Sequence, residues 1–191
     1  KSLRNVEAVT DIIEVLQDER YLYIVQELVE GESLRAIRDR RERISASGLK
    51  NLMYDLADAM GQLEERGILH RDIKPDNIFV DKYGKFKIGD FGIARICDKA
   101  SADLSKKGTD NYMAPEVYHG KEYDHTVDIY SLGLVLYKFL NNNRLPFYPT
   151  GNSFSEWDVQ QALIDRLGGK KEIPLPCSAS QELGKIIVRM C

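Results

Sequence analysis

The chain has 191 residues, of which 43% are hydrophobic and 30% are charged, and its 27 lysines and arginines against 30 acidic residues give a net charge of −3. This composition is ordinary for a soluble globular protein and suffices for one substantial core or two small ones. The slightly acidic balance gives no basis for an electrostatic grip on nucleic acid or on an anionic membrane, so both classes are set aside.

The spacing of the cysteines and the length of the apolar runs indicate the cellular compartment of the protein. Cys97, Cys177 and Cys191 are widely separated and odd in number. They form neither a disulfide framework nor a metal pattern, so we expect a reducing, cytoplasmic location. The longest apolar run, 132–140, is far too short to span a bilayer and contains Lys138. These observations on cysteines and apolar runs are compatible with a membrane anchor outside this segment.

The first elements are predicted from the periodicity of apolar residues. Residues 11–17 and 21–29 are two β-rich runs around a short polar turn, which predicts an antiparallel hairpin. Residues 31–44 are expected to form a short helix. From Ser47 the apolar residues recur at helical spacing, and Gly67 stands where a helix C-cap is expected. This pattern predicts a long amphipathic helix with one face on the core.

The second half of the chain is predicted to be mostly helical. Residues 78–80 and 85–90 flank a turn-forming stretch and predict a second tight hairpin, and 92–113 are polar and irregular. Residues 126–142 are apolar almost all round, as in a buried helix, and further helices are expected at 155–167 and from Ser180. Helices with small antiparallel strand pairs make this an α+β fold.

A strongly polar loop, HRDIKPDN at 70–77, stands between two apolar segments. Loops with this many ionisable groups are either solvated or held in place for chemistry. Asp90, Phe91 and Gly92 follow as a DFG motif, and an APE motif ends at Glu116. These three motifs, in this order and with a hairpin and a helix between them, resemble the catalytic core of eukaryotic-like protein kinases across essentially all of the chain.

The resemblance implies transfer of a phosphoryl group from ATP with Mg²⁺, or alternatively Mn²⁺, to protein substrates. Asp72 corresponds to the loop aspartate that accepts the proton of the substrate hydroxyl, and Lys74 to the lysine that neutralises the γ-phosphate. Asn77 and Asp90 correspond to the two residues that hold the metal with hard oxygen ligands. For each of the four, a plain structural role, such as a loop carboxylate that caps a turn, is the alternative.

The same resemblance assigns structural roles to other motif residues. His70 and Phe91 correspond to the family's internal hydrophobic spine, and Gly92 completes the DFG motif. Asp128 corresponds to a buried helix residue that anchors the backbone of the catalytic loop. Glu116 corresponds to the glutamate that pairs with an arginine near the end of the family's domain. His70 is then a packed histidine rather than a base.

The nucleotide-binding residues are also implied by position. Gln26 falls at the gatekeeper position, and Glu27 to Val29 form the hinge, whose backbone groups pair with adenine. Leu34 and Phe79 are expected to pack against the adenine ring, although both would serve equally well as core residues.

Two features resemble the serine/threonine branch of the family. Lys74 stands two residues after Asp72, and Thr109 corresponds to the threonine that bonds the catalytic aspartate and lysine and shapes the pocket beside the acceptor. The segments 127–147 and 174–191 look most like bacterial Hanks-type kinases.

Arg71, directly before Asp72, implies regulation. A buried arginine at this position usually needs an anionic partner from the activation loop. We expect Ser101 or Ser105 to be phosphorylated and to pair with Arg71. Asp103 can partly supply the charge, and the alternative is that both serines are ordinary loop residues.

The family's GxGxxG loop and VAIK-type lysine do not occur in this sequence. We therefore expect residues 1–26 to be a remnant of the N-terminal lobe, 27–32 the hinge, and 33–191 a C-terminal lobe that stops before its last helix. Such a fragment should bind ATP poorly and transfer phosphate slowly, and its exposed apolar surface could favour a homodimer. The alternative function is a pseudokinase or half-kinase that acts as a protein-binding module.

Overall fold

The computed structural model describes residues 6–40, 42, 44–91, 111–151 and 153–191. The chain forms two compact units: residues 1–69 with 75–91, and residues 70–74 with 92–191. This division does not test the predicted boundaries of the lobes and the hinge, which remain a prediction. Within the described residues, no helix is both long enough and apolar enough to cross a membrane.

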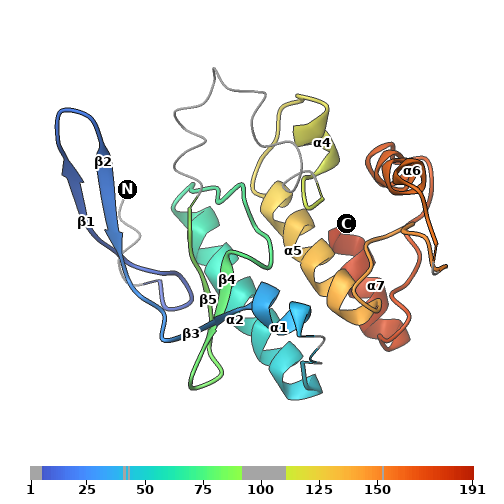
Figure 1. Ribbon diagram of the computed structural model, residues 1–191, viewed down its shortest axis with the longest axis horizontal. Coiled ribbons are helices and arrows are strands. Elements are labelled where there is room, and N and C mark those ends of the chain that lie inside the picture. The colour runs from blue at the N-terminus through green and yellow to red at the C-terminus, as the bar shows by residue number, and fades with distance from the viewer. Residues whose placement is uncertain (1–5, 41, 43, 92–110, 152) are drawn as a thin grey trace. The chain divides into compact units, whose positions relative to one another are not determined.

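The first unit contains two antiparallel sheets and two helices (Figure 1). One sheet pairs β1 with β2, and the other has the order β3-β4-β5. The elements are β1 (Ile12–Gln17), β2 (Leu22–Gln26), β3 (Gly31–Ser33), α1 (Leu34–Asp39), α2 (Ala46–Glu65), β4 (Ile78–Asp81) and β5 (Phe86–Ile88).

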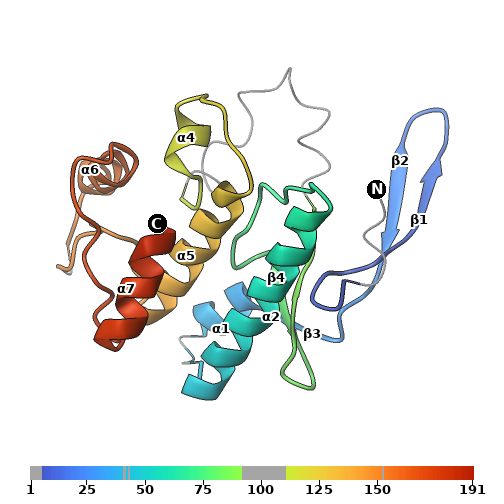
Figure 2. The ribbon, with the colours of Figure 1, turned by 180° about the vertical axis from the view of Figure 1, so that it is seen from behind.

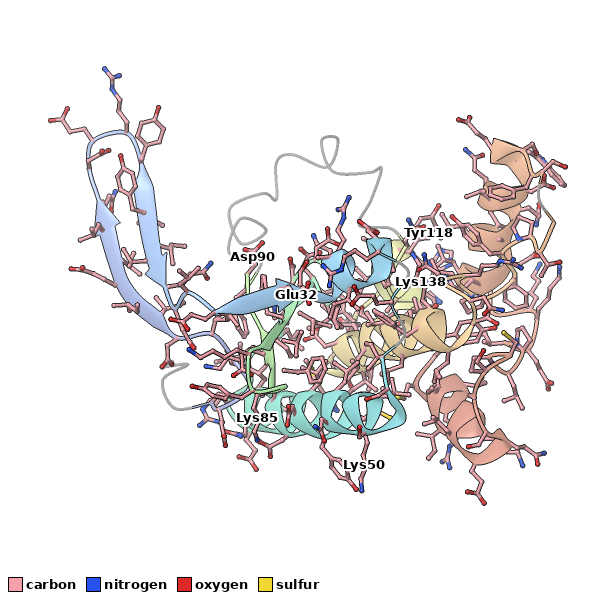
Figure 3. All side chains as sticks on the ribbon, turned by 60° about the horizontal axis from the view of Figure 1, so that its bottom comes forward. Glu32, Lys50, Lys85, Asp90, Tyr118 and Lys138 are labelled. Atoms are coloured by element: carbon pink, nitrogen blue, oxygen red, sulfur yellow. The ribbon has the colours of Figure 1, made fainter. Side chains whose placement is uncertain are left out.

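The β1–β2 hairpin confirms the first predicted strand pair. Its register runs from Ile12 opposite Gln26 to Gln17 opposite Leu22. The turn is closed by Asp18, whose carboxylate accepts hydrogen bonds from the backbone N–H groups of Arg20 and Tyr21, each at 2.7 Å. Apolar side chains project from both faces of the ribbon and are exposed (Figure 3).

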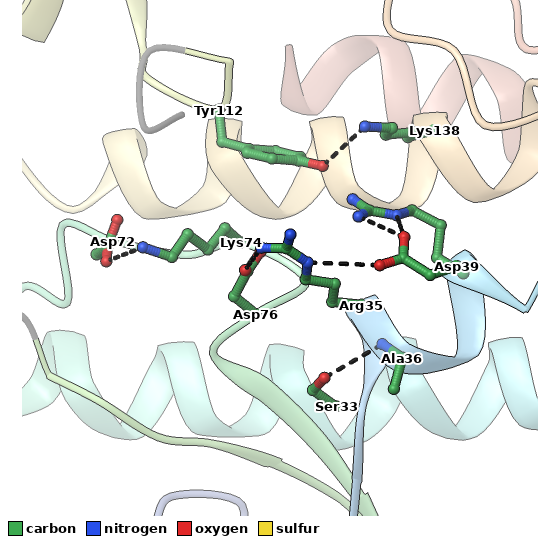
Figure 4. A network of polar contacts seen from close by, with 10 residues as sticks. Ser33, Arg35, Ala36, Asp39, Asp72, Lys74, Asp76, Tyr112 and Lys138 are labelled. Atoms are coloured by element: carbon green, nitrogen blue, oxygen red, sulfur yellow. Dashed lines mark hydrogen bonds and ion pairs between the residues drawn. The ribbon is translucent and has the colours of Figure 1, made fainter. Parts of the chain in front are cut away.

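The predicted helix over 31–44 is wrong at both ends, because Gly31–Ser33 form β3 and the helix α1 covers only Leu34–Asp39. Gly31 lies so close to β4 that a Cβ atom on it would be 2.8 Å from the Cα of Asp81 and would overlap the carbonyl oxygen of Val80. Ser33 then caps α1, since its hydroxyl accepts a hydrogen bond from the Ala36 N–H at 3.2 Å (Figure 4).

Helix α2 confirms the predicted amphipathic helix and packs beside β5 in both views (Figures 1 and 2). Gly67 follows it with φ +61°, the left-handed conformation that favours glycine after a helix. The Phe86 N–H donates to the Asp55 carboxylate at 2.9 Å and so joins α2 to β5. The core-facing residues of α2 are at most 8% exposed and include Leu49, Leu52, Leu56, Met60 and Leu63.

The second unit contains four helices among its described residues. They are α4 (Pro115–Tyr118), α5 (Thr126–Leu140), α6 (Glu156–Leu167) and α7 (Gln181–Met190). Helix α5 is buried over most of its length, as predicted, and α7 packs along it. Gly133 permits this approach, because a Cβ atom there would be 2.8 Å from both the Cys191 Sγ and the Met190 Cβ. Helix α4 has no counterpart in the sequence prediction.

Candidate active site

Asp72 and Lys74 form an ion pair on the loop of the second unit. The Lys74 Nζ lies 2.7 Å from the Asp72 Oδ2, and the two side chains are only 24% and 14% exposed (Figure 4). A charge-assisted hydrogen bond of this length is among the stronger polar contacts in proteins. The structure therefore brings together the two residues that the sequence assigned to the acceptor hydroxyl and the γ-phosphate.

The backbone around Asp72 is anchored by the buried carboxylate of Asp128 on α5. Its Oδ2 accepts the His70 N–H at 2.7 Å and its Oδ1 accepts the Arg71 N–H at 2.8 Å. Arg71 has φ +65°, which non-glycine residues seldom adopt, so these two hydrogen bonds hold a strained turn. The buried His70 accepts the Asp72 N–H at 3.3 Å through Nδ1. Asp128 thus makes the contact that the resemblance predicted, and it orients Asp72 through the backbone.

The expectation that Arg71 is buried is wrong. Its side chain is exposed, and its guanidinium carbon lies 5.6 Å from the centre of the Tyr123 ring. Tyr123 is itself 39% exposed, so the guanidinium covers an aromatic face at the surface instead of entering the core.

Asn77 and Asp90 belong to the first unit, at one end of the β4–β5 pair. Asn77 immediately precedes β4, and Ile78 lies opposite Ile88 in the ladder. The Gly89 N–H donates to the Asn77 carbonyl at 2.9 Å, so Asp90 follows directly from a residue bonded to Asn77. Figure 3 shows Asp90 where the chain leaves β5. Both metal-binding candidates therefore flank the same strand pair.

The donor set at Asn77 and Asp90 fits Mg²⁺. An amide and a carboxylate are hard oxygen ligands, and Mg²⁺ is commonly held by one or two protein groups while phosphates and water complete its octahedron. Among the described residues, no group of three or more His, Cys, Asp or Glu side chains is arranged to hold a metal. A metal held at Asn77 and Asp90 together with the phosphates of a nucleotide stays a prediction.

The predicted hinge begins at Glu27, and its side chain is held in place. The Glu27 N–H donates to the Asp11 carbonyl at 2.8 Å, and the Asp11 N–H donates to the Glu27 Oε2 at 3.2 Å. The Lys87 Nζ donates to the Glu27 Oε1 at 2.5 Å. Sequence reasoning missed Lys87, although its place between the buried Phe86 and Ile88 marks it as the outward residue of β5.

Replacing Glu27 by glutamine should weaken the pH dependence of stability. Partial burial alone would raise the pKa of Glu27, but the hydrogen bond and charge of Lys87 and the Asp11 N–H outweigh it and lower this pKa. The pair therefore stabilises the fold above the unfolded pKa of about 4.3 and stops doing so as pH falls through the lower folded pKa. We expect an effect below about 1 kcal/mol, because the pair is partly solvated.

The measurement is the free energy of urea unfolding at pH 7 and pH 3. Its difference between the two pH values should be smaller in Glu27→Gln than in the unmodified chain. Glu30→Gln is the control, because the Glu30–Lys82 pair is far more exposed, with Glu30 at 71%. An unchanged pH difference in Glu27→Gln would contradict the assignment.

The remaining candidates for nucleotide binding differ in their burial and in the elements that carry them. Gln26 ends β2 and is exposed, and Val29 is half-buried. Leu34 is 0% exposed at the start of α1, as a core residue would be. Phe79 is half-buried on β4, opposite Ser33. Their contact with adenine stays a prediction.

Sequence reasoning also missed an ion pair that joins α1 to the loop before β4. The Arg35 Nη1 lies 2.5 Å from the Asp76 Oδ1, and its Nε lies 3.5 Å from the Asp39 Oδ2 (Figure 4). The Arg35 N–H also donates to the Pro75 carbonyl at 3.0 Å. Since Arg35 is 57% exposed, these pairs add little stability.

The other motif residues divide between described and undescribed positions. Phe91 is half-buried, and Glu116 lies half-buried in the first turn of α4. Gly92 and the activation-loop candidates Ser101, Ser105 and Thr109 lie outside the described residues.

Comparison with known proteins gives a consistent picture. A family model described as "Protein kinase domain" matches residues 1–191. A probable serine/threonine-protein kinase PknB of Bifidobacterium longum is 40% identical over 139 residues, covering 71% of this chain and 20% of the relative. A cGMP-dependent protein kinase of Plasmodium berghei is 39% identical over 163 residues, covering 85% and 18% respectively.

A probable LIM domain-containing serine/threonine-protein kinase of Dictyostelium discoideum is 34% identical over 172 residues, which is 90% of this chain and 25% of the relative. The chain thus spans about a fifth to a quarter of the length of these relatives. They come from bacterial and eukaryotic organisms alike.

Proposed function

The chain belongs to the protein kinase domain family, and on that premise we propose that it is the catalytic domain of an ATP-dependent serine/threonine kinase acting on proteins. The observation that carries the proposal is the Asp72–Lys74 ion pair, on a loop whose backbone is bonded to the buried Asp128. A loop that is merely solvated does not require a strained turn whose backbone N–H groups are bonded to a buried carboxylate.

The chemistry assigned to these residues is positioning and charge neutralisation. Asp72 orients the acceptor hydroxyl and takes its proton as the oxygen bonds to the γ-phosphorus and the bond to the β-phosphate oxygen breaks, which releases ADP. Lys74 neutralises charge on the transferred phosphoryl group. Asn77 and Asp90 would hold Mg²⁺, which supplies further neutralisation of the phosphates when bound.

The serine/threonine preference is supported by Lys74, two residues after Asp72, and by the similarity to probable serine/threonine-protein kinases. We further propose that Thr109 shapes the pocket beside the acceptor, and that residues 111–114, which follow it, belong to the acceptor side of the domain. A bacterial lineage is supported by the Bifidobacterium relative, and a cytoplasmic location by the sparse cysteines.

We propose that phosphorylation of Ser101 or Ser105 regulates the domain through Arg71. The exposed guanidinium of Arg71 supports this, because an incoming phosphate could reach it without entering the core. Phosphopeptide mapping of active protein that finds neither serine modified would contradict this regulation. A homodimer through the exposed β1–β2 hairpin is a separate proposal, which a monomer in light scattering at high concentration would exclude.

The experiment that tests the function measures Mg²⁺-dependent phosphate transfer from ATP to a generic serine/threonine substrate. It compares this chain with protein extended upstream, since the family's glycine-rich loop and lysine precede the segments found here. Transfer that is abolished by chelating the metal supports the kinase. No transfer even from loop-phosphorylated protein that still binds ATP would favour the protein-binding module instead.

A further inference from the structure

Arg166, in the last turn of α6, is a buried cation that the proposed chemistry does not use. It is 4% exposed, and arginines are rarely buried to this extent unless they are paired. Its Nη1 donates to the Met113 carbonyl at 3.3 Å and to the Tyr130 hydroxyl at 3.0 Å. Its guanidinium carbon also lies 5.8 Å from the centre of the Tyr130 ring. One guanidinium therefore joins α6, α5 and the segment that precedes α4.

The residue before Met113 is held by α5 in the same way. The Ser131 Oγ donates to the Tyr112 carbonyl at 2.7 Å. The Lys138 Nζ lies 3.3 Å from the Tyr112 hydroxyl and 5.6 Å from the centre of its ring (Figure 4). The carbonyl groups of Tyr112 and Met113 are thus both bonded to side chains. Side-chain donors from α5 and α6 therefore hold the backbone of this segment.

The next residue of α6 contacts the other end of α4. The Leu167 carbonyl lies 3.2 Å from the His119 Nε2, and His119 directly follows α4. Two consecutive residues of α6, Arg166 and Leu167, therefore hold Met113 before α4 and His119 after it. A displaced Arg166 would release the N-terminal flank of α4 while leaving the other flank bonded.

We propose that Arg166 is a positioning residue for the protein substrate, acting through the 112–114 segment. The proposal rests on the proposed function, in which residues 111–114 belong to the acceptor side of the domain. By holding the Met113 carbonyl, Arg166 keeps this segment in one conformation and lowers the entropic cost of docking a polypeptide beside it. Binding of ATP, which does not involve this segment in the proposed function, should be indifferent to Arg166.

The test compares Arg166→Met, Arg166→Lys and Tyr130→Phe in the protein extended upstream, with casein as substrate. Arg166→Met should raise the KM for casein about tenfold, as expected when the Met113 carbonyl loses its hydrogen bond from a charged group, and leave the KM for ATP within about twofold. Arg166→Lys should rescue only part of this, because the shorter lysine side chain ends in a compact ammonium and lacks the planar guanidinium that lies against the Tyr130 ring. Arg189→Met, an exposed arginine on α7, is the matched control and should change neither KM.

A second readout does not depend on catalysis. Amide hydrogen exchange over 112–119 should be faster in Arg166→Met than in the unmodified protein, with α2 unchanged. If Arg166→Met does not fold, Tyr130→Phe is the variant that tests the proposal, since it keeps the aromatic ring and removes the hydroxyl that accepts a hydrogen bond from Arg166. A KM for casein that is about twofold higher in Tyr130→Phe supports the proposal. An unchanged casein KM, or equal rises in both KM values, overturns it. No transfer by the unmodified protein would overturn the proposed function and with it the substrate role, while faster exchange would still establish the contact of Arg166 with this segment.

Discussion

Replacing Asp72 by asparagine is expected to lower kcat for phosphate transfer by about two to four orders of magnitude, the range typical for loss of a general base. The amide keeps the shape of the side chain but cannot take the proton of the acceptor hydroxyl. It also removes the charge that holds Lys74 at 2.7 Å. Since Lys74 is 24% exposed and can be hydrated, the fold should survive. The measurement is kcat with casein, in the protein extended upstream.

Asp76→Asn is the matched control, because it makes the same chemical change in the same loop. The Asp76 carboxylate pairs with the half-exposed Arg35, and an ion pair of this solvent-exposed kind contributes little. We expect its kcat within about twofold of the unmodified protein. Equal losses in the two variants would mean that loop charge, rather than a base at Asp72, explains the effect. An Asp72→Asn protein with normal kcat would remove Asp72 from the chemistry.

Replacing Asp128 by alanine is expected to reduce the free energy of unfolding by about 3 to 5 kcal/mol. The carboxylate is 3% exposed and accepts two backbone N–H groups, at 2.7 and 2.8 Å. Its removal would leave both donors unsatisfied and would remove the support for Arg71 at φ +65°. Urea unfolding of the 191-residue chain measures the stability, and kcat should fall as well, because Asp72 follows directly.

Asp124→Ala is the comparison for Asp128→Ala. Asp124 is exposed beside the start of α5, where its Oδ1 accepts the Thr126 hydroxyl at 2.6 Å and the Thr126 N–H at 2.9 Å. These two bonds lower the pKa of Asp124. Its loss should cost much less stability than the loss of Asp128, because Asp124 and its partner Thr126 are exposed to water. A loss of stability no greater in Asp128→Ala than in Asp124→Ala would show that the loop does not depend on the buried carboxylate.

Periodic elements were predictable because their signal is local. The spacing of apolar residues in α2, α5, α6 and α7 reflects burial of one face or of nearly all of a helix, and the two hairpins are marked by short polar turns. The strand β3 was not predictable, because its three residues are held by β4, which lies more than forty residues later in the chain. No local pattern carries a pairing of this kind.

The residue types of the candidate site were determined by the sequence alone. Phosphoryl transfer needs a carboxylate, a cation and hard oxygen ligands, and Asp72, Lys74, Asn77 and Asp90 are recognisable by type and order before any packing is known. The tertiary structure decided what holds the site residues in place. The bond from His70 to Asp128 spans 58 residues, and that from Arg166 to Met113 spans 53. Contacts at this separation depend on how helices pack, which is a property of the folded chain and of no short segment within it.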